Sequence, residues 1–118
     1  MGFVESNTRT FEAGAAIGRH LRVKLTSGTL AVAGATDTEE VGTMNEASFA
    51  AGEVKAVRLR SAMGTAEMVA AGSITVGSEI FTAASGKVST TQATNAVRVG
   101  VALTAAGADG DVIEVLRD

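Results

Sequence analysis

The fold is decided by residues 20–33, which read HLRVKLTSGTLAVA. From Leu21 to Leu25 every second residue is apolar, which is the pattern of a strand with one buried face. Gly28 follows in a short polar segment and can adopt a positive φ without steric cost, so it predicts a hairpin turn. Residues 30–33 then form a second apolar run. The segment therefore predicts an antiparallel β-hairpin.

The same alternation between glycine-containing turns recurs over the rest of the chain. It predicts further strands at residues 41–44, 54–60, 65–69, 79–83, 87–90, 97–103 and 111–116. Residues 6–18 could instead be helical because of their alanines, and residues 46–51 could form one helical turn, although Gly14 and Gly18 weaken the first interpretation. Short strands broken by Gly about every eight to twelve residues are typical of a small barrel or a sandwich. We therefore expect an all-β fold.

The sequence is also similar to itself at an offset of 58 residues, a signal typical of a duplicated unit. The matching pairs are mainly turn glycines and apolar strand residues: Ala13-Gly14 with Ala71-Gly72, Gly28 with Gly86, Val41-Gly42 with Val99-Gly100, Gly52 with Gly110, and Val57 with Val115. Ile17-Gly18 and Leu21 match Val76-Gly77 and Ile80 only after a one-residue slip. Chance agreement is the alternative in a chain so rich in Gly, Ala and Val. The order of the matches favours one β domain at residues 13–118, built from similar halves at about 13–60 and 71–118.

Residues 1–12 have no counterpart in the second half that is separable from the bridge at residues 61–70, and they predict an extended N-terminal arm. Threonines and phenylalanines favour extended structure, and half of the four Phe residues of the chain lie here. One interpretation is an ordinary edge strand of the domain. The other is an arm that adds a strand to a second protein. Its candidate partner-binding residues are Phe3, Val4, Thr8, Thr10 and Phe11.

Composition excludes several classes of function. The 118 residues contain no Cys, Tyr, Trp or Pro and a single His, so disulfides, thiolate metal sites, cysteine nucleophiles and most aromatic stacking platforms are excluded. A net charge of −3 argues against binding nucleic acid through a basic patch. The chain lacks a run of about 18 apolar residues and a secretory signal, so we expect no membrane span. Gly2 fits a loose myristoylation pattern, but no second membrane anchor follows it.

Four motifs resemble chemical sites, and each has a simpler interpretation. His20 has no second His or Cys nearby in sequence, and Asp109-Gly110-Asp111 is first of all a hairpin turn. The acidic residues of segment 34–40, which are Asp37, Glu39 and Glu40, and the threonines of segment 89–95 predict exposed polar loops. Residues 14–18 lack the Lys and the βαβ context of a phosphate loop. We expect no catalytic, cofactor-binding or metal site, and hence not an enzyme.

The motifs assembled above resemble those of small bacteriophage capsid decoration, or cement, proteins. An Ala-Gly, apolar, Gly, Leu pattern that leads into a glycine hairpin occurs at residues 13–30 and again at 71–88. A Val-Gly-x-Ala strand occurs at residues 99–103 and more loosely at 41–44, where Thr43 and Met44 depart from the small-residue pattern. A Gly-acidic-Val ending occurs at residues 52–54 and 110–112.

This resemblance implies a β-rich module, often a homotrimer, that sits at three-fold positions on a mature capsid and reinforces its shell. The implied partner is the major capsid protein, to which the N-terminal arm adds a strand. The implied location is the capsid exterior of the virion, and the host cytoplasm during assembly. No nucleic acid, membrane, cofactor or small-molecule substrate is expected. The alternatives are a β-clip-like or carbohydrate-binding module, although sugar sites usually use exposed aromatic residues, or a non-catalytic subunit of an enzyme complex.

Overall fold

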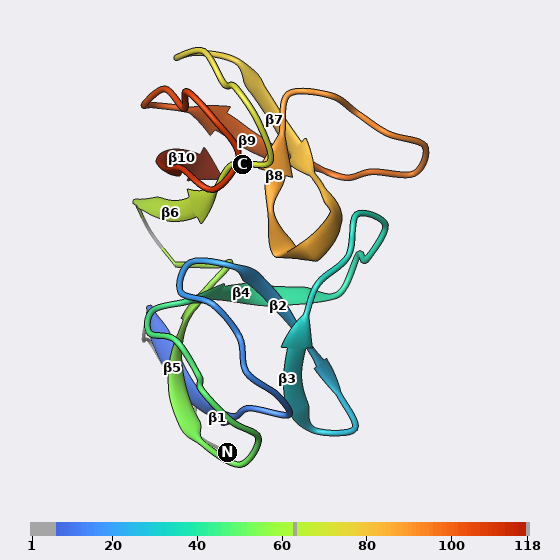
Figure 1. Cartoon of the computed structure of the whole chain (residues 1–118), viewed down its shortest axis with the longest axis vertical. Helices are drawn as coiled ribbons and strands as arrows, with labels where there is room; N and C mark the ends of the chain where they lie inside the picture. Colours follow the sequence, from blue (N-terminus) through green and yellow to red (C-terminus); the bar gives the residue numbers. More distant parts are fainter. Residues whose placement is uncertain (1–6, 63, 118) are drawn as a thin grey trace.

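The computed structural model describes residues 7–62 and 64–117, and these form two antiparallel five-stranded sheets (Figure 1). The first sheet has the order β1-β5-β4-β2-β3, and the second has the order β6-β10-β9-β7-β8. The strand bounds are β1 Thr8–Glu12, β2 Arg22–Thr26, β3 Thr29–Val32, β4 Glu40–Met44, β5 Val54–Leu59, β6 Thr65–Val69, β7 Glu79–Thr82, β8 Val88–Ser89, β9 Arg98–Ala102 and β10 Val112–Arg117. A single 3₁₀ turn, η1 (Ala84–Gly86), joins β7 to β8. The predicted all-β fold is confirmed.

The two sheets are copies of one arrangement, which confirms the prediction of two similar halves. Isolated bridges occur at equivalent places: Ala13–Leu30 and Ile17–Ser48 in the first half, and Ala70–Val88 and Ile74–Ala106 in the second. Equivalent residues are therefore 57 positions apart up to β2 and 58 positions apart from β3 onward. The extra residue lies in the β7–β8 turn, where η1 replaces the tight turn at Ser27 and Gly28. The sequence alignment of Ala13 with Ala71 is thus one residue out of register.

Residues 8–12 have their counterpart in the predicted bridge, and the repeat therefore begins before residue 13. Strand β1 pairs with β5 from Thr8 opposite Arg58 to Glu12 opposite Val54. Strand β6, predicted as part of the bridge, pairs with β10 in the equivalent register. Each half therefore begins with an edge strand, and the helical interpretations of residues 6–18 and 46–51 are wrong for the residues that the structure describes.

Each half has its own apolar core. The first is built around Ile17, Val23, Leu30, Met44 and Val57, with Phe11, Leu21, Val32 and Val41 packed against it. The second contains the equivalent positions Ile74, Ile80, Val88, Ala102 and Val115, together with Met68 and Ile113. Strands approach so closely at Gly42 and Gly100 that a Cβ atom on either would lie 1.9 Å from a carbonyl oxygen of the next strand. The close approach of neighbouring strands therefore requires glycine at positions 42 and 100.

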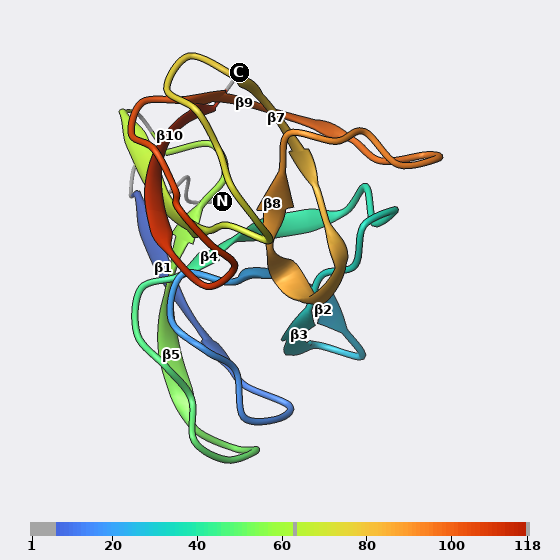
Figure 2. The same cartoon turned by 45° about the horizontal axis from the view of Figure 1, so that its top comes forward.

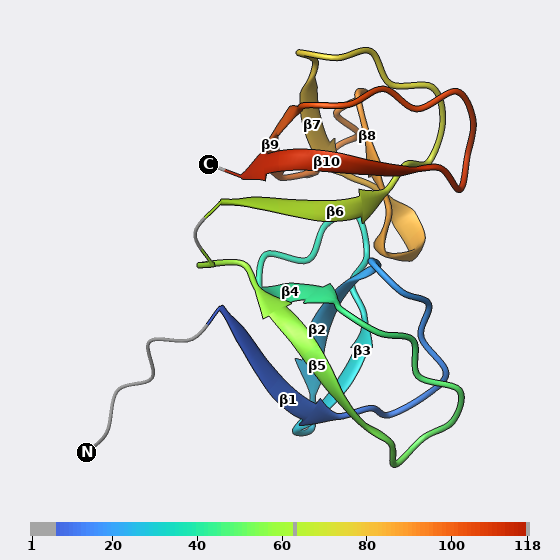
Figure 3. The same ribbon diagram turned by 90° about the vertical axis from the view of Figure 1, so that its left-hand side faces the viewer.

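The halves stack end to end, with the first half (blue to green) below the second (yellow to red) in Figure 1. Strand β6 lies beside β10 in its own sheet and near β4 of the other sheet, as Figure 3 shows. The main-chain N–H of Gly86 donates to the carbonyl oxygen of Ala33 at 2.8 Å, and the hydroxyl of Thr82 donates to that of Ala35. A Cβ on Gly86 would lie 3.0 Å from the carbonyl oxygen of Arg22. The η1 turn of the second half therefore packs directly on the first.

A buried charged cluster also joins the halves. The side chain of Arg22 is fully buried and donates from Nη1 to Glu40 at 2.9 Å, while Nε and Nη2 donate to the carbonyl oxygens of Lys87 and Ala83 at 3.1 and 2.6 Å. Arg117 of the second half donates to the other carboxylate oxygen of Glu40. Glu40 is 5% exposed, so its predicted place in an exposed loop is wrong. Its carboxylate is buried because the second half covers this part of the first sheet. The predicted exposure is confirmed for residues 90–95.

Candidate functional site

The structure describes three of the five predicted partner-binding residues. Phe3 and Val4 lie outside the described residues. Thr8, Thr10 and Phe11 lie on β1, at the edge of the first sheet, where Thr10 is exposed and Thr8 is half-buried. The ring of Phe11 packs against the core of the first half. The guanidinium of Arg9 lies over this ring, 4.9 Å from the ring centroid. Phe11 therefore serves the core of the first half as well as its edge.

One side of β1 is directed away from the sheet. The N–H of Leu59 donates to the carbonyl of Asn7, and the N–H of Ala13 donates to that of Glu53. Hydrogen-bonded pairs alternate along an antiparallel ladder, so the backbone groups of Arg9 and Phe11 also face β5. Those of Thr10 then face outward, where a further strand can pair with them, whereas the carbonyl of Glu12 faces β3 at the bridge between Ala13 and Leu30. Figure 3 shows β1 at this outer position.

A groove runs beside this edge. Strand β1 meets β3, the opposite edge of its own sheet, at the bridge between Ala13 and Leu30. Near the start of β1 a groove of about 380 Å³ has an apolar lining formed by Phe11, Leu25, Val41 and Leu59, with polar residues such as Arg9 at its rim. Leu25 is 42% exposed there. The first half thus offers a strand edge and an apolar groove side by side.

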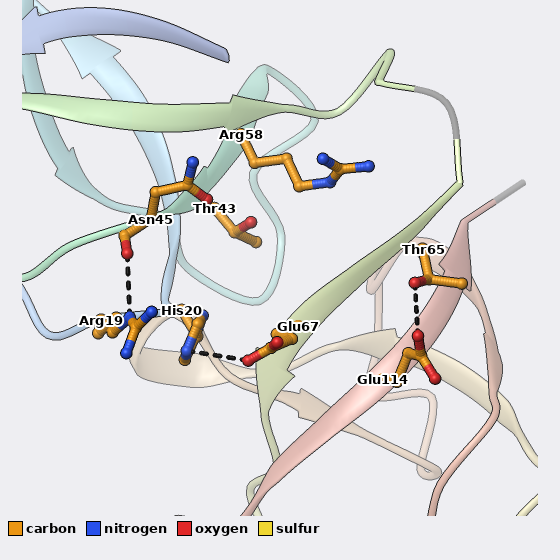
Figure 4. A pocket seen from close by; sticks show the side chains of 8 residues that line it. All are labelled: Arg19, His20, Thr43, Asn45, Arg58, Thr65, Glu67 and Glu114. Atoms are coloured by element: carbon orange, nitrogen blue, oxygen red, sulfur yellow. Dashed lines mark hydrogen bonds and ion pairs between the residues drawn. The ribbon is translucent and has the colours of Figure 1, made fainter. Parts of the chain in front are cut away.

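A more polar cleft of about 530 Å³ lies at the junction of the two halves (Figure 4). Nε of Arg19 donates to the carbonyl oxygen of Asn45 at 3.0 Å, and Nε2 of His20 lies 3.1 Å from a carboxylate oxygen of Glu67 in β6. Across the cleft the hydroxyl of Thr65 donates to Glu114 at 2.7 Å. The His20–Glu67 contact therefore joins the two halves on this side.

The environment of His20 favours the neutral form of its imidazole by lowering its pKa. Partial burial is the main cause that lowers the pKa of His20 below its ordinary value, Arg19 acts in the same direction, and Glu67 opposes them. His20 also adopts a φ of 66°, in the left-handed region. The contact of His20 with Glu67 joins the two halves, so we assign His20 a structural role at their junction.

One exposed aromatic residue was missed by the sequence analysis. Phe49, in the loop between β4 and β5, is 80% exposed. In the 58-residue alignment it stands opposite Gly107, and this mismatch was a signal that the sequence already contained. The loop lies at the lower end of the molecule in Figures 1 and 2, far from the second half.

Two further features concern the described part of the chain as a whole. Across residues 7–62 and 64–117, His and acidic side chains do not gather in groups of three or more that could hold a metal ion. Nor does this part contain a helix long and apolar enough to cross a membrane. The features that remain are strand edges, grooves and exposed apolar residues.

These features define a class of protein, namely a tandem β-repeat whose candidate site is a contact surface. The family model for phage cement proteins matches residues 4–117. The chain therefore belongs to the phage cement protein family, and its role is structural, in stabilising a phage capsid. As a capsid-associated protein, it is located in the virion. This assignment favours the cement role over the ligand-binding and enzyme-subunit alternatives.

The fold is similar to that of a solved phage structure, the head fiber gp8.5 N base in bacteriophage phi29. The TM-score is 0.77, with 15% sequence identity, and the match covers 94% of this chain and 92% of that chain. At this identity the likeness shows the fold alone. A comparison with curated protein sequences gives no match.

Proposed function

We propose that this protein binds the outer surface of a phage head and reinforces the shell by pairing with a strand of the major capsid protein. The observation that carries the proposal is the outward-facing edge of β1 at Thr10. A strand added there would gain main-chain hydrogen bonds, and its side chains could enter the groove beside Phe11. We include Phe3 and Val4 in the proposed contact from their sequence alone.

The proposed role is mechanical and involves no catalysis, cofactor or nucleic acid. The net charge of −3 and the apolar groove favour a protein partner over a polyanion. The protein would be present in the host cytoplasm until it binds the capsid exterior.

We further propose a homotrimer. The second half covers Arg22 and Glu40 of the first half, whereas the equivalent residues of the second half, Glu79 and Arg98, are exposed. A head-to-tail ring would cover this face of the second half with the first half of the next chain. Sedimentation equilibrium should then give about three times the 11.8 kDa mass of the chain, and a purely monomeric protein would contradict this part of the proposal.

Strand addition is tested by co-sedimentation with expanded heads, prepared without this protein from the phage that encodes it. Thr10→Pro removes an outward N–H but leaves the hydrogen bonds between β1 and β5 intact, so it should weaken binding at least about tenfold without unfolding the protein. Thr10→Val keeps the N–H and is the matched control. Deletion of residues 1–6 tests Phe3 and Val4. Wild-type binding by both Thr10→Pro and the deletion variant would refute strand addition.

A further inference from the structure

The loop between β4 and β5, residues 45–53, presents an apolar tip. Phe49 is 80% exposed, and its neighbours Ala50 and Ala51 are exposed as well. Val54, which follows the loop, is 63% exposed. A large exposed aromatic side chain among small residues is a common anchor for a partner surface, because small neighbours allow close approach.

The second half contains a natural comparison for this loop. Phe49 corresponds to Gly107, and the flanking bridges Ile17–Ser48 and Ile74–Ala106 correspond as well. The N–H of Phe49 donates to the carboxylate of Glu53 at 3.1 Å, and the N–H of Gly107 donates to that of Asp111 at 2.9 Å. The same turn therefore forms without an aromatic ring, so the fold does not require a Phe at position 49.

The two loops also differ in polarity. Ala51 of the first loop corresponds to Asp109 of the second, and Asp109 forms an ion pair with Lys87 at 2.7 Å. The tip of the first half thus carries a large apolar side chain, whereas the equivalent tip of the second half carries charges. Since both loops form the same turn, the fold does not account for the apolar side chain of the first tip.

The apolar tip is continuous with the proposed edge of β1. Glu12 at the end of β1 pairs with Val54. The N–H of Ala13 donates to the carbonyl of Glu53 at 2.7 Å, and the N–H of Gly52 donates back to the carbonyl of Ala13 at 2.8 Å. A protein that pairs with β1 therefore lies next to the loop that carries Phe49.

We propose that the ring of Phe49 inserts into an apolar depression on the outer surface of the major capsid protein, beside the strand that pairs with β1. This inference rests on the proposed function and adds a second, side-chain anchor to it. The capsid is favoured over a second copy of this chain because the tip adjoins the β1 edge at which the capsid strand is proposed to pair.

The test compares the affinities of variants for the same undecorated heads. Phe49→Gly copies the second half and should fold with an unchanged thermal midpoint. Burial of a Phe side chain corresponds to about a tenfold to hundredfold change in affinity, so binding should weaken by that factor. Val112→Ser removes another exposed apolar side chain, in the second half, and should change affinity less than about twofold.

The outcomes separate this inference from the proposed function. If Phe49→Gly binds heads as tightly as the wild type while Thr10→Pro does not, the Phe49 anchor is refuted and strand addition stands. If Phe49→Gly instead changes the mass of the free protein in sedimentation equilibrium, the ring contacts a second copy and the inference is wrong. If wild-type protein fails to bind heads, both proposals fail.

Discussion

Replacing Glu40 with Gln would leave the guanidinium of Arg22 buried without its carboxylate partner. Arg22 is 0% exposed and Glu40 is 5% exposed, so solvent cannot replace the lost charge. Removing one partner of a buried ion pair costs about 3–5 kcal/mol, and the amide oxygen that Gln retains favours the lower end of that range. With an unfolding entropy of about 2.1 cal/mol/K per residue, a chain of this size loses about 4 °C of melting temperature per kcal/mol. Glu40→Gln should therefore lower the melting temperature by about 12 °C or more.

The repeat supplies the control for this experiment. Glu79 and Arg98 occupy the positions equivalent to Arg22 and Glu40, with the charges exchanged, and their side chains are 66% and 38% exposed. In the single chain this exposed pair contributes about 0–1 kcal/mol, so Glu79→Gln should shift the melting temperature by less than about 4 °C at protein concentrations where the chain is monomeric. Thermal and urea unfolding at neutral pH measure both variants. Equal shifts, or a loss below about 1 kcal/mol for Glu40→Gln, would refute the assignment of the buried cluster as a clamp between the halves.

Two further predictions concern the fold. Gly42→Ala and Gly100→Ala should each destabilise the protein by at least about 1–3 kcal/mol in urea unfolding, because the added Cβ would lie 1.9 Å from a carbonyl oxygen. Gly72→Ala is the control and should be tolerated, because a Cβ there meets nothing within 4 Å. Equal effects at all three positions would contradict this reasoning. The pKa of His20 is lower in the folded protein than in the unfolded chain, where it is about 6.5. The stability that neutral His20 contributes is therefore present above that unfolded pKa and is lost as the pH falls through the folded pKa, so acidification should destabilise the wild type. His20→Gln should reduce that pH dependence, as measured by urea midpoints between about pH 7.5 and pH 5, and an unchanged pH profile would exclude His20 as its source.

Local sequence patterns predicted most strands because period-two alternation and glycine turns are properties of neighbouring residues. The pairing of β1 could not be predicted in this way. Thr8 lies opposite Arg58, and this contact depends on residues far apart in the chain. The burial of Glu40 escaped prediction for the same reason, because it requires the second half to cover the first. The register of the repeat was missed by one residue because η1 is longer than the turn at Gly28.

The candidate site was predicted less completely than the fold. Thr10 was identified from β propensity, and the structure places it on an exposed sheet edge. Phe11 was expected as an anchor for a partner, but much of its ring packs against the core of its own half. Phe49 was overlooked because one aromatic residue in a loop has no periodicity to reveal it. A comparison of the halves position by position identifies it.

The groove beside β1 also depends on side chains that differ between the two halves. Phe11 and Met68 occupy equivalent positions, yet Met68 is fully buried whereas Phe11 remains partly exposed and lines the groove. Leu25, at the same groove, corresponds to Thr82, which is buried and hydrogen-bonded across the junction of the halves. At the equivalent place the second half has a more polar cleft, which is lined by Thr82, Val99 and Arg117 and partly walled by the first half. One backbone arrangement therefore forms with an apolar groove in one half and a polar cleft in the other. Since the fold is compatible with both, the apolar groove and the Phe49 tip are not requirements of folding, and their occurrence on the same half as the outward β1 edge is the strongest argument that this half contacts the capsid.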